Sequence, residues 1–184
     1  GKRRFPNWPV PRDPDADTTA ALLFFDPVMI DAYKTWIRQL FTRVNPYTGV
    51  ALKDEPALAI FQIQNEDSLL FWTLNNLKGA DRALLEQQFG NWQAALYGKA
   101  GDTTIPNLYD LTQAAPADAE QARHLADVTH FLTETMREFN GGIIAYVRDE
   151  LGAKCLINPG NLRTASTVYL NDAERYSYAV GDVL

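Results

Sequence analysis

The most regular hydrophobic pattern in the chain begins just after Asp26 and Pro27. Aspartate is a favoured N-cap residue, and proline is a favoured first residue of a helix. Apolar side chains then recur at the three- and four-residue spacing of one buried helix face, at Ile30, Tyr33, Ile37, Leu40, Phe41 and Val44. The turn-forming run Asn45–Gly49 follows. The pattern predicts a helix that begins at Asp26–Pro27 and ends at this turn.

Short apolar runs predict strands farther along the chain. The segment from Ala57 to Glu66 follows Asp54-Glu55-Pro56, is partly β-branched and is too short for a free-standing helix. It therefore predicts a strand buried on both faces, as in a parallel sheet. Lys154–Ile157 predicts the next strand, and Tyr178–Leu184 is expected to begin a third.

The segments between the first two strands predict helices. Apolar positions over residues 68–97 indicate two helices divided at Gly79, and residues 98–116 are expected to form a loop with a short helical turn. A long helix is predicted over residues 117–151, with Gly152 where a glycine often ends a helix. Alternating helices and strands predict crossover connections and therefore a parallel sheet.

Composition supports a single globular domain over residues 1–184. Hydrophobic residues make up 46% of the chain, which is enough for one core and excludes a disordered or fibrous protein. Four of the ten prolines lie within residues 1–25 and predict an irregular, proline-rich lead-in. No composition shift divides the remaining sequence.

Charge and cysteine content exclude several kinds of function. The net charge of −6 argues against a nucleic-acid binder and gives no reason to expect attraction to anionic membranes. No run approaches the roughly 18 apolar residues of a membrane span, and the basic N-terminus lacks the apolar segment of a signal peptide. Cys155 is the one cysteine, so neither a disulfide nor a paired-thiolate metal site is expected. His124 and His130 lie six residues apart, on different helix faces, and predict no zinc pair.

The candidate chemistry lies at the carboxyl end of the first predicted strand, where Asn65 and Glu66 stand. Parallel α/β folds carry their chemistry at that end. A shielded carboxyl group there has a raised pKa and can serve as a general acid near neutral pH. The alternative is that Glu66 caps the following helix, for which Asp67 and Ser68 are also suited.

A family resemblance adds to this interpretation. Asn45-Pro-Tyr-Thr-Gly49, followed by Asp54–Ser68, resembles the fourth strand and its approach in clan A glycoside hydrolases, (β/α)8-barrel enzymes that include cellulases and mannanases. Glu150–Ile157 is similar to the end of their helix four and strand five, and Tyr178–Leu184 resembles the opening of strand six. The likeness extends from about Phe24 to the end. It implies an α/β fold, a partial TIM barrel of about strands four to six with their helices.

The resemblance also implies roles for two residues, and two further residues are candidates for the same cleft. Glu66 matches the catalytic acid/base, and Asn65 matches the residue that contacts the hydroxyl beside the anomeric carbon. Trp72 would stack on a sugar ring, with ordinary packing as the alternative. Asn161 would line the same cleft, with loop capping as the alternative.

The departures from the family pattern shape the expected function. The family's nucleophile, a second glutamate that ends strand seven, has no counterpart, and neither do strands one and two. Asp182 is the one candidate carboxylate on a late predicted strand, and the resemblance gives it no nucleophile role. The chain is therefore expected to be part of a retaining hydrolase of a β-linked glycan that is inactive alone. The alternatives are a non-catalytic carbohydrate-binding or assembly module with a barrel-like fold, and an unrelated α/β protein.

The expected partners follow from this interpretation. We expect an oligo- or polysaccharide ligand, no cofactor, no metal, and no nucleic-acid or membrane partner. Unpaired sheet edges invite pairing with another chain, so self-association or a missing partner fragment is expected. The sequence does not fix the compartment, and the resemblance is compatible with a secreted or periplasmic protein.

Overall fold

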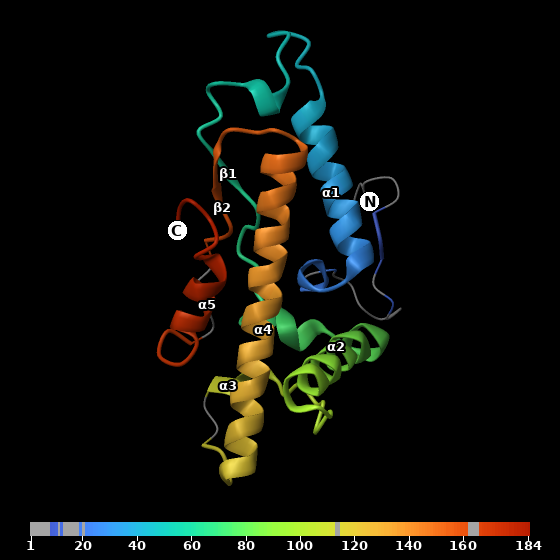
Figure 1. The fold of residues 1–184 in the computed structure, drawn as a ribbon, viewed down its shortest axis with the longest axis vertical. Coiled ribbons are helices and arrows are strands. Elements are labelled where there is room, and N and C mark those ends of the chain that lie inside the picture. Colours follow the sequence, from blue (N-terminus) through green and yellow to red (C-terminus); the bar gives the residue numbers. More distant parts are fainter. Residues whose placement is uncertain (1–7, 11, 13–18, 20, 113–114, 162–165) are drawn as a thin grey trace.

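The computed structural model describes residues 8–10, 12, 19, 21–112, 115–161 and 166–184 (Figure 1). Helices form most of its regular structure, together with a short two-stranded sheet. The elements in chain order are η1 (Leu22–Phe24), α1 (Pro27–Thr42), η2 (Leu52–Asp54), β1 (Ile60–Gln62), η3 (Trp72–Asn76), α2 (Gly79–Tyr97), α3 (Leu108–Thr112), α4 (Ala119–Ala145), η4 (Tyr146–Glu150), β2 (Leu156–Asn158) and α5 (Asn171–Tyr178).

Helix α1 begins as its sequence predicts. The Asp26 carboxylate accepts a hydrogen bond from the Val28 N–H at 3.1 Å, and Pro27 is the first helical residue. This contact satisfies one of the N–H groups that a helix leaves unpaired at its start. The buried face of the helix consists of Met29, Tyr33, Ile37 and Phe41. Leu40 and Val44, which the pattern also assigned to that face, are exposed.

Strands β1 and β2 pair in parallel, with Ile60 opposite Leu156 and Gln62 opposite Asn158. The prediction of two parallel strands at these places is confirmed, although each strand has three residues. Burial on both faces is wrong for β1, because Ile60 and Leu156 are each 49% exposed. One face packs on α1 through the rings of Phe61 and Phe41, whose centroids lie 5.0 Å apart. No described element covers the other face.

Helix α4 forms the long axis of the molecule and lies beside α1, α2 and α5 (Figure 1). Asp118 caps its start by accepting the Gln121 N–H at 2.8 Å. Its buried residues include most of the predicted stripe, namely Val128, Leu132, Met136, Phe139 and Ile143. The helix continues through η4 to Gly152, which has the positive φ of +74° that a helix-ending glycine adopts. The long predicted helix is therefore confirmed.

The segment before α2 differs from its prediction. Residues 68–78 contain the 3₁₀ turn η3 and no α-helix, and α2 begins at Gly79. The Leu69 N–H approaches the Met136 sulfur at 3.2 Å, and the Leu70 N–H donates to Ser68 Oγ at 2.9 Å. These two backbone donors are thus satisfied by side chains outside any helix.

The predicted third strand is wrong at its start, because Tyr178 ends helix α5. Residues 181–184 form no strand in the described structure. They nevertheless lie beside β2, since the Asp182 N–H donates to the Ile157 carbonyl at 2.9 Å. The Ile157 N–H donates in turn to the Asp182 carboxylate at 2.8 Å. Two parallel strands with helices fit an α/β fold. Closure into a barrel requires more strands, so the partial barrel stays a prediction.

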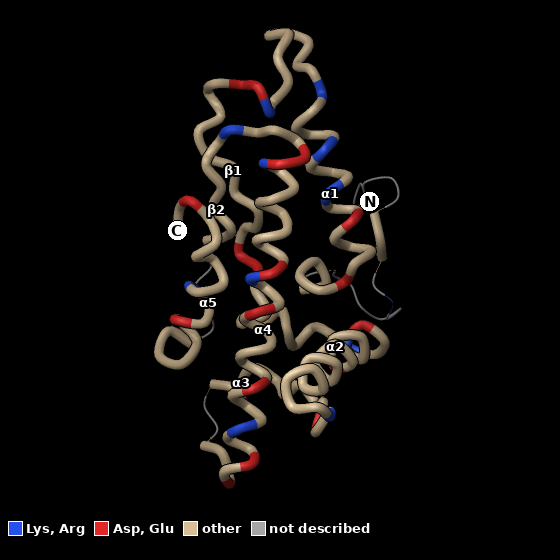
Figure 2. The backbone as a smooth tube through the Cα atoms, in the orientation of Figure 1, with Lys and Arg blue, Asp and Glu red and all other residues tan. Residues whose placement is uncertain are grey.

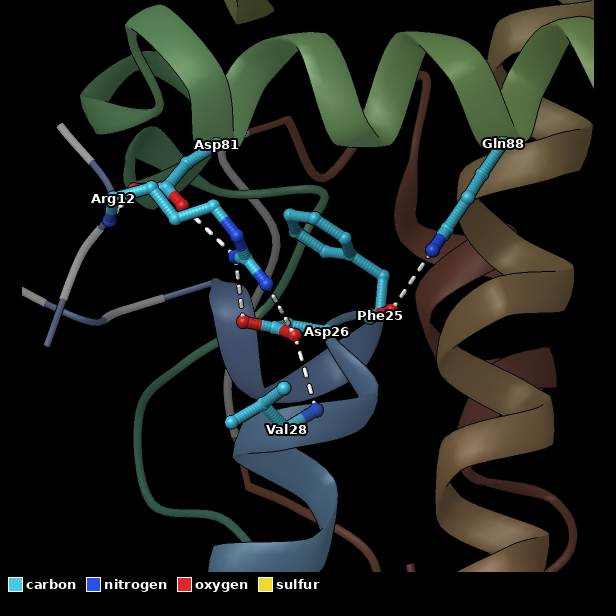
Figure 3. A network of polar contacts seen from close by, with 6 residues as sticks. All are labelled: Arg12, Phe25, Asp26, Val28, Asp81 and Gln88. Atoms are coloured by element: carbon cyan, nitrogen blue, oxygen red, sulfur yellow. Dashed lines mark hydrogen bonds and ion pairs between the residues drawn. The ribbon is translucent and has the colours of Figure 1, made fainter. Parts of the chain in front are cut away.

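Arg12 joins the start of α1 to the start of α2 (Figure 3). Its guanidinium donates to Asp26 at 2.7 and 2.9 Å and to Asp81 at 3.1 Å, and its backbone N–H also donates to Asp81. Both carboxylates are 2% exposed, so their charges require a partner. Gln88 on α2 adds a hydrogen bond to the Phe25 carbonyl at 3.0 Å. These contacts fix α2 against the start of α1.

The described surface carries both signs of charge. Figure 2 shows Lys and Arg residues interspersed with Asp and Glu residues along the chain. Within the described ranges, no helix has both the length and the apolar character needed to cross a bilayer.

Candidate active site

The turn after β1 carries the predicted pair Asn65 and Glu66. Pairing with the second strand continues past β1, because the Ile63 N–H donates to the Asn158 carbonyl and the Gln64 N–H to the Pro159 carbonyl. Glu66 then adopts a φ of +53°. Left-handed backbone costs a non-glycine residue about 1–2 kcal/mol, so surrounding contacts must hold this conformation.

Asn161 provides such a contact from the end of β2. Its Oδ1 accepts the backbone N–H of Glu66 at 3.1 Å, and its Nδ2 donates to Asn65 Oδ1 at 3.1 Å. Gln62 Nε2 also approaches Asn65 Oδ1 at 3.5 Å. The structure thus brings together three of the four predicted site residues. Asn161 thus caps the loop that contains Glu66, which is the alternative role predicted for it.

The Glu66 carboxyl group itself faces solvent. It has no hydrogen-bond partner among the described residues, and the side chain is exposed. It caps no helix, since the N-cap residues of η3 and α2 are Phe71 and Lys78. Glu66 is also absent from the lining of five surface cavities of about 450–800 Å³ that are formed by described residues. The shielding expected from the sequence is absent there, because two strands leave the inner face of the sheet open.

Trp72 lies apart from this hydrogen-bonded group. It begins the 3₁₀ turn η3 and is 48% exposed. Half of the side chain is therefore accessible for stacking on a ligand ring. The contacts of the described structure do not join it to Asn65, Glu66 or Asn161.

Asp182 and the two histidines have structural partners. The Asp182 carboxylate pairs with Arg148 and accepts the Ile157 N–H, which holds it on β2. His124 Nε2 lies 4.0 Å from Asp102, and His130 Nε2 lies 3.1 Å from Glu134. No group of three or more His, Cys, Asp or Glu residues in the described part of the chain is placed to hold a metal ion.

A buried carboxyl group behind the Glu66 turn was not singled out by the sequence. Glu174 on α5 is 2% exposed and accepts hydrogen bonds from Ser68 Oγ, at 2.6 Å, and from the Tyr178 hydroxyl. Burial raises the pKa of Glu174, and the two hydrogen bonds partly offset this rise. Glu174 and Tyr178 have the i, i+4 spacing of one helix face, which is the one local signal for this pair. The contact with Ser68 spans 106 residues and leaves no local signal.

Three plant mannanases share a segment of this sequence. A putative mannan endo-1,4-beta-mannosidase 4 of Arabidopsis thaliana is 33% identical over 66 residues, which is 36% of this chain and 16% of that protein. Mannan endo-1,4-beta-mannosidases 3 and 2 of Oryza sativa subsp. japonica are 36% identical over 67 residues and 29% identical over 66 residues.

These similarities are local. The match covers 36% of this chain in each case and only 14–16% of the length of the mannanases. No family model matches the chain, and no solved structure matches it. The shared segment supports a relationship to glycoside hydrolases.

Proposed function

We propose that this chain carries the acid/base part of a retaining glycoside hydrolase that acts on a β-linked mannan. Glu66 is the acid/base. The main observation in support is that Glu66, four residues after β1, has a left-handed backbone conformation, and its N–H is held by Asn161, three residues after the parallel strand β2. A glutamate whose backbone is held just beyond the carboxyl ends of two parallel strands stands where such folds perform chemistry. The local similarity to mannanases supports the substrate class.

The neighbouring side chains suggest a division of roles. Protonated Glu66 donates its proton to the departing glycosidic oxygen and, as carboxylate, later takes a proton from the attacking water. Asn65 Oδ1 accepts from Asn161, and this contact orients the Asn65 side-chain nitrogen as the donor for a sugar hydroxyl. The half-exposed Trp72 supplies a ring face for a sugar.

The second carboxylate of a retaining pair is proposed to come from outside the described residues. Such a pair lies about 5–5.5 Å apart, and Asp182 is engaged by Arg148. Ile60 and Leu156 expose apolar surface on the uncovered sheet face, which supports a covering partner. We propose that this partner is either a second copy of the chain or further strands of a (β/α)8 barrel.

A non-catalytic carbohydrate-binding module is the second candidate. The exposure of Glu66 favours it, because an unshielded carboxyl group lacks the environment of a general acid. Such a module would retain the contacts of Asn65 and Trp72 with sugar and would show no turnover.

Binding and turnover assays on the full chain separate these candidates. We expect a β-1,4-mannan hexasaccharide to bind by calorimetry, Trp72→Ala to weaken binding, and Glu138→Gln, an exposed acid on α4, to leave it unchanged. We expect no hydrolysis of aryl β-mannosides, because no described residue is placed to act as the nucleophile. Turnover that survives repurification and is lost in Glu66→Gln would show that the catalytic pair is complete. Absence of both binding and turnover would overturn the proposal.

A further inference from the structure

The buried carboxyl group of Glu174 connects α5 to the turn that carries Glu66. Ser68 stands two residues after Glu66 and donates its hydroxyl hydrogen to Glu174 Oε2 at 2.6 Å. The Ser68 oxygen meanwhile accepts the Leu70 N–H at 2.9 Å. One serine side chain thus links the main chain leaving Glu66 to a carboxyl group on a distant helix. Ser68 is fully buried, so water cannot replace this link.

The other oxygen of Glu174 is connected, through Tyr178, to the segment that follows β2. It accepts a hydrogen bond from the Tyr178 hydroxyl. The Tyr178 ring lies against Gly160, where a Cβ atom would come within 3.0 Å of the ring. Gly160 precedes Asn161, whose Oδ1 accepts the Glu66 N–H at 3.1 Å.

These contacts close a ring behind the candidate site. The ring runs through Glu66, Ser68, Glu174, Tyr178, Gly160 and Asn161, and back to Glu66. Glu66 and Asn161 are exposed and Gly160 is buried, whereas Ser68, Glu174 and Tyr178 are at most 6% exposed. The two oxygens of one carboxyl group therefore anchor both sides of the site from the interior.

We propose that Glu174 is a positioning residue, which holds Glu66 at its positive φ through Ser68 and holds Asn161 against it through Tyr178. The inference rests on the proposed function only in treating this site as the catalytic one. Loss of the Glu174 carboxyl leaves Ser68 and Tyr178 without their buried acceptor. Both sides of the ring then loosen, and the hydrogen bond between Glu66 and Asn161 opens more often.

Amide hydrogen exchange, followed by NMR on the full chain without sugar, measures that opening directly. Glu174→Ala should speed exchange of the Glu66 N–H about tenfold relative to a core amide such as Leu132, the effect of one lost hydrogen bond. Glu174→Gln should restore protection, because its amide oxygen accepts from Tyr178 and its nitrogen donates to Ser68 Oγ. Asp81→Ala is the matched control, since Asp81 is also 2% exposed and lies outside the ring.

Several outcomes would overturn the proposal. One is that exchange at Glu66 in Glu174→Ala rises only as far as exchange at Leu132 does, which is the result of general destabilisation. Another is that Asp81→Ala affects Glu66 equally, or that Glu174→Gln fails to restore protection. If Glu174→Ala does not fold, Ser68→Ala and Tyr178→Phe each remove one link, and each should selectively speed Glu66 exchange. Hexasaccharide binding is measured separately, so its absence would remove the proposed function and leave the exchange result to decide the positioning role.

Discussion

Asn161 holds the backbone of Glu66 and the side chain of Asn65 with the two ends of a single amide group. Its oxygen accepts the Glu66 N–H, and its nitrogen donates to Asn65 Oδ1, both at 3.1 Å. The amide is thus oriented by its partners, and each partner is oriented by the amide. The candidate site depends on this one side chain more than on any contact of the Glu66 carboxyl group.

Replacing Asn161 should therefore weaken sugar binding. Asn161→Ala removes both hydrogen bonds, and we expect affinity for a β-1,4-mannan hexasaccharide to fall about tenfold, the effect of about 1.4 kcal/mol. Asn161→Asp keeps the acceptor for Glu66 and loses the donor to Asn65, so its affinity should be intermediate. Calorimetry measures both. Asn76→Ala, at an exposed asparagine of η3, should bind like the wild type, and an equal loss there would contradict the prediction.

Glu174 should make stability depend on pH. Because burial raises its pKa above the ordinary value of about 4.3, the folded chain binds this proton more tightly than the unfolded chain does. Its contribution to the free energy of unfolding is fully present below the ordinary pKa and is lost as the pH rises through the raised one. Glu174→Gln should lose less stability than the wild type over that range in urea unfolding. The free energy of unfolding of Glu138→Gln should depend on pH as the wild type's does. The same pH dependence in Glu174→Gln as in the wild type would contradict the role given to Glu174.

Arg12 should be the most important surface cation for stability. Arg12→Ala removes the guanidinium that pairs with the buried carboxylates of Asp26 and Asp81, and we expect a loss of roughly 2–3 kcal/mol. Arg38→Ala removes an ion pair with Glu150 in which both side chains are more than half exposed. That loss should stay below about 1 kcal/mol. Urea unfolding compares the two variants, and equal losses would show that the Arg12 network contributes little.

Two glycines should respond to alanine in opposite ways. At Gly160 an added Cβ lies 3.0 Å from the Tyr178 ring, so Gly160→Ala should destabilise the chain and disturb Asn161. At Gly141, inside α4, no atom lies within 4 Å of an added Cβ. Gly141→Ala should stabilise the chain by about 0.5–1 kcal/mol, because alanine is the better helix former. Thermal unfolding measures both, and shifts of the same sign would contradict the described packing.

The open sheet face should promote association if a second copy covers it. Ile60→Asp places a charge beside Leu156 on this face and should shift any dimer toward monomer. Sedimentation at increasing concentration measures the shift. Val168→Asp, at a residue that is 79% exposed outside the sheet, is the control. A wild-type chain that stays monomeric would favour further strands as the covering partner.

Local chemistry explains which elements the sequence predicted. The cap at Asp26, the stripe of α4 and the apolar runs of β1 and β2 depend on neighbours in the sequence. Residues 68–78 and α5 depend on distant groups instead. The Leu69 N–H contacts the Met136 sulfur, and the Glu174 carboxyl group on α5 accepts a hydrogen bond from Ser68. The periodicity of the sequence does not indicate contacts between residues so far apart.

The same distinction applies to the candidate site. Asn65 and Glu66 could be predicted because a strand end is visible in the sequence, and Asn161 follows the next strand. The exposure of Glu66 could not be predicted, since it depends on what covers the exposed face of the sheet. The roles of these residues stay predictions.

The parallel pairing of β1 and β2 has a consequence for how this chain folds. Parallel neighbours require a crossover, here the whole of α2, α3 and α4, and the contact of Glu66 with Asn161 closes a loop of 95 residues. Closing so long a loop costs conformational entropy before any stabilising contact forms, so contacts between distant residues slow folding. The helices have mostly local contacts and can form early. The two halves of the candidate site therefore meet late, and a partly folded chain would contain every helix and still have no site.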